Sequence, residues 1–259
     1  MQLQATYPTT EHERAAECVV AFLAGYAEVD AVLLVGSCTR GKGFHDIDFV
    51  ALAGPDTSDD AHAALWAGWE AFDADAPALR AVRDLGEFGR VDMDIIDGSF
   101  SPDSRGWTSG PSQFELEVGN YVAYSVPLFE RGDRYSRLRL DWLPHYGDTL
   151  ARERLLEARK YCLNNLSHVH TFVERGIHFQ AFHRLYDAFR EFIQALFIAR
   201  RTYPIAYDKW IREQIVEILG LPGLYDALVG VLAIGDIESD AASRHACVLE
   251  ELLEEYAPA

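Results

Sequence analysis

The first half of the chain alternates helical and extended hydrophobic patterns. Apolar residues recur at helical spacing over Glu11–Ala27 and Asp59–Phe72. Short apolar runs bounded by glycine, proline or aspartate predict strands at Ala31–Val35, Asp46–Ala53 and Arg90–Ile96. This alternation predicts an α/β (α+β) domain built on a mixed sheet.

The segment that follows has a weaker pattern. Residues 99–119 are rich in glycine, serine, proline and aromatic side chains, which predicts an irregular crossing. The apolar run Tyr121–Phe129 predicts a further strand or edge element.

After Pro144 the pattern becomes helical throughout. The periodicity predicts five helices, at about Leu150–Val173, Phe179–Ala199, Ala206–Leu219, Tyr225–Leu232 and Ala241–Tyr256. The change of character near residues 140–148 predicts two domains, an α/β domain over 1–145 and an all-α bundle over 146–259.

Composition narrows the class of protein. The formal charge of −18 over 259 residues argues against an extended nucleic-acid contact, which requires clustered Lys and Arg. The sequence shows neither a secretory leader nor a membrane-length apolar run. The four cysteines are far apart, without a C-x-x-C pair, as in reduced proteins. We therefore expect a cytoplasmic protein, either monomeric or homodimeric.

The main chemical signal lies between Val32 and Leu52. An apolar strand ends at Gly36-Ser37, and the next strand opens with Asp46 and Asp48. Alternate residues of a strand point to the same face, so the two carboxylates are neighbours. Such a pair repels itself unless a cation lies between them, and Mg²⁺ prefers oxygen ligands of this kind.

The same segment matches most of the sequence motif of a phosphate-binding P-loop. Gly36 to Lys42 reads G-x-x-x-x-G-K, but Gly43 stands where Ser or Thr would bind Mg²⁺. A P-loop also needs a helix immediately afterwards, whereas HDIDFVAL predicts a strand. We therefore expect Gly36 and Ser37 to contact phosphate oxygens, with Arg40 and Lys42 neutralising charge in the same loop.

A two-metal site usually needs a third carboxylate. The strand GRVDMDIID offers Asp92 and Asp94, which parity places on one face, so the residues alone leave both open.

The sequence VGSCTRGKGFHDIDFV resembles the signature of the nucleotidyltransferase superfamily that includes DNA polymerase beta. A small catalytic domain followed by a helical bundle is similar in layout to the adenylyltransferases that modify aminoglycoside and lincosamide antibiotics. In those families the third acid opens a strand, and VDMDII matches best with Asp92 there, leaving Asp94 as the alternative.

The resemblance implies a fold and a reaction. The implied fold is a mixed sheet flanked by helices, with the active site on its open face and the helical domain covering it. NTP, most simply ATP, would place its triphosphate at Gly36 and Ser37, with two Mg²⁺ ions held by Asp46, Asp48 and Asp92. Asp92 would take the proton of an acceptor hydroxyl. Lys209, beside aromatic residues of the bundle, would contact the triphosphate.

The expected partners are a nucleotide and a small hydroxylated acceptor, such as an aminoglycoside-like or lincosamide-like antibiotic. Two alternatives stay open: AMP transfer to a protein, as in antitoxin-like members, and a nucleotide-binding module without catalysis. A polymerase or tRNA-modifying role is disfavoured by the charge. Trp107, Glu115 and Glu117 are weaker candidates for a cationic acceptor's pocket.

Overall fold

A computed structural model describes residues 3–107 and 109–259 of the chain. The chain forms two compact units, and each is described by itself. The sheet unit comprises residues 1–101 and 120–143, and the helical unit comprises residues 102–119 and 144–259. Within the described part of the chain, no helix has both the length and the apolar character to cross a membrane.

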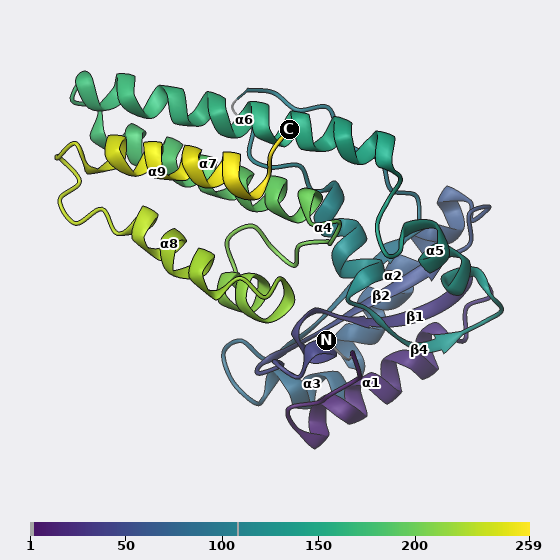
Figure 1. Cartoon of the computed structure of the whole chain (residues 1–259). Helices are drawn as coiled ribbons and strands as arrows, with labels where there is room; N and C mark the ends of the chain where they lie inside the picture. Colours follow the sequence, from purple (N-terminus) through teal and green to yellow (C-terminus); the bar gives the residue numbers. More distant parts are fainter. Residues whose placement is uncertain (1–2, 108) are drawn as a thin grey trace. The chain divides into compact units, whose positions relative to one another are not determined.

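The sheet unit is built on four strands in the order β3-β2-β1-β4. Their bounds are β1 Val29–Val35, β2 Asp46–Ala53, β3 Arg90–Ile96 and β4 Val126–Glu130. Figure 1 labels β1, β2 and β4 of this sheet. β1 is antiparallel to both β2 and β4, whereas β2 and β3 are parallel. The predicted mixed sheet with helices is therefore confirmed, and two of the three early strands have their predicted bounds.

Three helices pack on one face of this sheet. They are α1 (Thr10–Leu23), α2 (Asp59–Asp75) and α3 (Pro77–Arg83). The hydroxyls of Thr9 and Ser58 cap the first two by accepting backbone N–H groups. The strand residues that complete this core alternate along each strand, as a half-buried sheet requires: Val32, Leu34, Ile47, Phe49, Ala51, Val91 and Met93.

The opposite face of the sheet has two parts. Toward the C-terminal end of β2, helix α5 (Arg134–Trp142) buries Leu138 near Leu52. Asp46 and Asp48 lie on this same face, because they alternate with the core residues of β2. The side chains of Asp46 and Asp48 therefore lie on the face of the sheet opposite α1, α2 and α3.

The helical unit consists mainly of three long helices packed together (Figure 1). These are α6 (Asp148–Glu174), α7 (His178–Ala199) and α9 (Ala241–Tyr256). Helix α8 (Pro222–Leu232) packs on α9 and on the π-helical turn η3 (Glu213–Ile218). The short helix α4 (Phe114–Val118) belongs to this unit as well.

The predicted helix Ala206–Leu219 is wrong over its first half. Residues 203–210 are irregular, and Trp210 has a positive φ of 57°. The side chain of Gln214 replaces helical hydrogen bonds here, since it accepts from the backbone of Ile205 and donates to the carbonyls of Ala206 and Lys209.

The apolar run Tyr121–Phe129 is a strand only in its second half. Its first residues form the π-helical turn η2 (Gly119–Ala123), and the strand begins at Val126. Residues 99–119, expected to be irregular, include α4.

Candidate functional site

The loop after β1 folds into a compact turn. Residues Gly36–Arg40 form a 3₁₀ turn, η1, with φ of 70° at Gly36 and 68° at the capping Gly41. The Gly36 carbonyl accepts from Thr39 Oγ1 at 2.9 Å and from Arg40 Nη1 at 2.7 Å. Backbone N–H of Lys42 donates to the Ser37 carbonyl at 3.0 Å. These bonds hold the turn, which leads after five further residues into β2 and not into the helix of a P-loop.

Gly36 lies directly against the Asp48 carboxylate. A Cβ atom placed on Gly36 would lie 2.1 Å from Asp48 Oδ2, far inside contact distance. Any residue except glycine would therefore have to displace that carboxylate. The glycine of the motif is thus required twice, by its φ and by this close approach.

Three carboxylates meet beside this turn. Asp48 is paired in register with Asp92 across the parallel strands, and Asp46 precedes it by two residues on the same face. Asp46, Asp48 and Asp92 each offer one oxygen, and these oxygens lie within 4.8 Å of one another. The side chains of Asp46 and Asp92 are 39% and 47% exposed, so the cluster is open to solvent.

The electrostatics of the cluster favour a bound cation. Burial and, after it, the charges of Asp46 and Asp92 raise the pKa of the Asp48 carboxyl from 3.8 to about 7. A carboxyl with so high a pKa resists ionisation until positive charge is added nearby. Three convergent carboxylate oxygens are also the donor set that Mg²⁺ prefers, so these residues fit that ion.

Asp94, the alternative third acid, lies outside this group. It is paired in register with Val50, one step further along β2, and its side chain is exposed. The Tyr121 hydroxyl donates to Asp94 Oδ2 at 2.9 Å. Among the described residues, the triad that brings oxygens together therefore contains Asp92 and not Asp94.

Arg90 is a member of the cluster that sequence reasoning missed. Its Nε donates to Asp92 Oδ2 at 2.6 Å, and its Nη2 lies 4.0 Å from Asp46 Oδ2. The available signal was its position two residues before Asp92, which places both side chains on one face of β3.

The predicted basic residues occupy different settings. Arg40 is buried, with 8% exposure, beneath the turn whose Gly36 carbonyl it binds. Lys42 is exposed just after η1. Lys209 is exposed in the irregular segment 203–210 of the helical unit.

Glu115 does not line an open pocket, which corrects its interpretation as an acceptor contact. It is fully buried in the helical unit and accepts from Arg154 Nε at 2.8 Å and Nη2 at 2.9 Å. Tyr146 and Gln194 donate to it as well. This carboxylate is neutralised within the fold, and its function is structural.

Trp107 and Glu117, the other weak candidates, are not part of that network. The Trp107 ring is half-exposed and lies 4.5 Å from Lys160 Nζ. Burial raises the pKa of the Glu117 carboxyl, which is half-buried.

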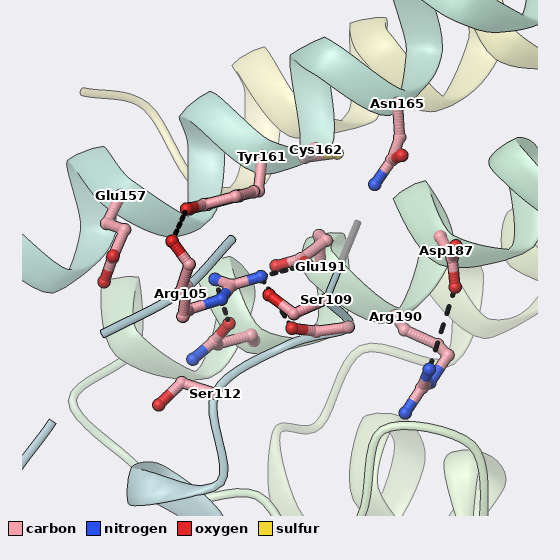
Figure 2. Close-up of polar contacts among 12 residues, drawn as sticks. Arg105, Ser109, Ser112, Glu157, Tyr161, Cys162, Asn165, Asp187, Arg190 and Glu191 are labelled. Carbon is pink, nitrogen blue, oxygen red and sulfur yellow. Dashed lines mark hydrogen bonds and ion pairs between the residues drawn. The ribbon is translucent and has the colours of Figure 1, made fainter. Parts of the chain in front are cut away.

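A second buried ion pair ties residues 102–119 to the helices (Figure 2). Arg105 forms an ion pair with Glu191 of α7, and Tyr161 of α6 donates to the Arg105 carbonyl at 2.8 Å. Glu191 is fully buried, and burial raises the pKa of its carboxyl to about 7 against the opposing effect of Arg105. The pair thus holds the crossing segment onto the helical unit.

Surface hollows of the described residues are lined by other side chains than the acidic cluster. One, of about 550 Å³, is lined in the helical unit by residues that include Arg152, Arg200 and Tyr256. Another, of about 520 Å³, lies along β4 and includes Tyr135 and Arg139. Neither contains a member of the acid triad.

Comparison with known proteins gives likeness at the level of solved structures. No protein-family model matches the sequence, and no curated protein shows significant similarity to it. Among solved structures, the chain is similar to a nucleotidyltransferase-like protein from Exiguobacterium sibiricum 255-15. The two are 14% identical with a TM-score of 0.48, over 95% of this chain and 75% of the other.

Proposed function

We propose that this chain is a Mg²⁺-dependent nucleotidyltransferase that moves a nucleoside monophosphate, AMP from ATP, onto the hydroxyl of a small molecule. The observation that carries the proposal is the convergence of Asp46, Asp48 and Asp92 beside the Gly36–Ser37 turn. A phosphate seat next to an acid triad is the arrangement that metal-assisted phosphoryl transfer needs.

The turn supplies the phosphate seat. Backbone and hydroxyl of Ser37 offer donors to phosphate oxygens, and Gly36 lets them approach closely. Buried Arg40 positions the turn through the Gly36 carbonyl and adds positive charge beneath it. Exposed Lys42 adds charge from the solvent side, and Lys209 is the candidate contact from the helical unit.

The acid triad supplies the metal ligands and the base. Asp46, Asp48 and Asp92 would hold two Mg²⁺ ions, which when bound neutralise the triphosphate and the charge that develops in the transition state. Asp92, whose side chain is 47% exposed and so open to an incoming acceptor, accepts the proton of the acceptor hydroxyl. The hydroxyl oxygen then attacks the α-phosphorus and pyrophosphate leaves.

The acceptor class is proposed from the resemblance to antibiotic adenylyltransferases. The formal charge of −18 suits a cationic acceptor such as an aminoglycoside, because opposite charge speeds encounter.

The test is a panel assay of pyrophosphate release. Purified protein with Mg²⁺ and each NTP is offered aminoglycosides, lincosamides and neutral polyols. We expect release with at least one acceptor and a matching gain in acceptor mass. Replacing Asp46 and Asp48 together by Asn should abolish both signals, whereas Asp133→Asn, at an exposed position of α5's N-terminus, should leave them unchanged. Equal turnover by the double variant would disprove the proposal.

A further inference from the structure

Arg90 occupies the position of a counter-ion in the acid triad. It opens β3, stands in register with Asp46 of β2 and precedes Asp92 by two residues. Its guanidinium therefore reaches two of the three carboxylates, at 2.6 Å from Asp92 Oδ2 and 4.0 Å from Asp46 Oδ2. The third, Asp48, is held against the Gly36 turn.

The ion pair between Arg90 and Asp92 is short, but it is exposed to solvent and can be displaced. Arg90 is 63% exposed and Asp92 47%, so the pair resembles surface ion pairs, which contribute little to stability on their own. Its neighbours change that comparison, because three carboxylates repel one another and one guanidinium relieves part of the repulsion.

A guanidinium and a divalent cation compete for such oxygens. Mg²⁺ coordinates carboxylate oxygen at close range and with strict geometry, so Asp92 Oδ2 cannot keep its full hydrogen bond to Arg90 while binding the ion. The two positive charges also repel each other at these distances. Occupation by one therefore weakens the other.

We infer that Arg90 is a built-in counter-ion that competes with the divalent cation for Asp92 and Asp46. This inference rests on the proposed function, since it assumes that the triad binds metal. In the metal-free protein Arg90 stabilises the acid cluster. Its consequence is that free Mg²⁺ binds weakly, so the site fills chiefly when the cation arrives with the anionic triphosphate, which offsets the charge of Arg90.

The test measures cation affinity without nucleotide. Mn²⁺ serves as the probe, titrated by electron paramagnetic resonance and calorimetry into the full chain. Arg90→Ala should bind Mn²⁺ roughly tenfold more tightly than wild type, the effect of removing one nearby positive charge. Arg90→Lys, which keeps the charge without the planar fork, should fall between them.

Controls separate this inference from the proposed function. Arg137→Ala removes an equal charge from an exposed pair in the same unit and should leave Mn²⁺ affinity at the wild-type value. Thermal unfolding in EDTA should show that Arg90→Ala is folded, with a lower midpoint and a larger rise on adding Mg²⁺. If wild type binds Mn²⁺, Asp48→Asn does not, and Arg90→Ala binds no more tightly, the counter-ion role is wrong while the metal site stands. If neither wild type nor Arg90→Ala binds Mn²⁺, both proposals fail.

Discussion

At the scale of single residues, Gly36 combines a backbone conformation that favours glycine with close contact to an acid of the triad. Gly36→Ala meets both a φ of 70° and a clash with Asp48 Oδ2, so we expect lost Mn²⁺ binding and a free energy of unfolding lower by about 1–3 kcal/mol. Gly41→Ala is the matched control, because its φ is 68° with no atom near the added Cβ. It should cost stability alone, as urea unfolding and Mn²⁺ titration would show. Equal Mn²⁺ affinity in both variants would contradict the role of the close approach.

The raised pKa of Asp48 predicts a pH-dependent stability. Its folded pKa of about 7 exceeds the ordinary value of 3.8, so the folded state binds the proton more tightly. The protonated Asp48 carboxyl therefore contributes its full stabilisation of the folded state below pH 3.8, and this stabilisation is lost as the pH rises through about 7. In EDTA, Asp48→Asn should be more stable than wild type at pH 8, and the difference should shrink toward pH 4. Urea unfolding at the two pH values measures this, and a constant difference would contradict it.

The register between β2 and β3 identifies the third acid of the triad, whereas the alternation of side chains along β3 does not. Asp92 and Asp94 share one face of β3, but Asp92 is paired with Asp48 and Asp94 with Val50. Asp92→Asn should lower kcat at least about 100-fold, the usual scale for a lost general base. Asp94→Asn removes a charge outside the triad and keeps an oxygen that can accept from the Tyr121 hydroxyl, so it should stay within a few-fold of wild type. The reverse ranking in single-turnover assays would assign the role to Asp94.

At the scale of elements, strands were easier to predict than the segments between them. Asp46–Ala53 and Arg90–Ile96 have clear ends and buried alternating residues, so local pattern determines their bounds. The start of Ala206–Leu219 has helical periodicity too, but Gln214 captures its backbone from within the fold. Hydrogen bonds from a side chain to the backbone cannot be predicted from the spacing of apolar residues.

The acid triad shows the same limit. Two of its members follow from the D-x-D spacing of β2, because strand geometry is local. Which acid of β3 joins them, and that Arg90 accompanies it, depend on the register between β2 and β3. Register is set by packing across 44 residues of chain, which one sequence does not display.

At the scale of the whole molecule, the chain passes between its two units three times. Residues 102–119 leave the sheet unit, and buried ion pairs hold them on the helices. Composition gives no sign of this, because glycine, serine and proline in 99–119 indicate only irregular backbone.

Glu115 tests how much the helical unit depends on that segment. Glu115→Ala leaves buried Arg154 without its main partner, which should lower the free energy of unfolding by about 3–5 kcal/mol. Glu117→Ala, two residues away and half-buried, should change it by less than about 1 kcal/mol. Chemical denaturation followed by circular dichroism makes the comparison. Similar losses in the two variants would show that the segment is held by other contacts.

The parallel pairing of β2 with β3 has a kinetic consequence. Asp48 and Asp92 become neighbours only after the chain has crossed through α2 and α3, and such non-local pairing is slow to form. A cation that needs both carboxylates cannot bind before this step. Mg²⁺ should therefore slow unfolding severalfold while leaving the refolding rate nearly unchanged, as stopped-flow fluorescence would record. Bound metal would then prolong the lifetime of the folded protein without speeding its formation.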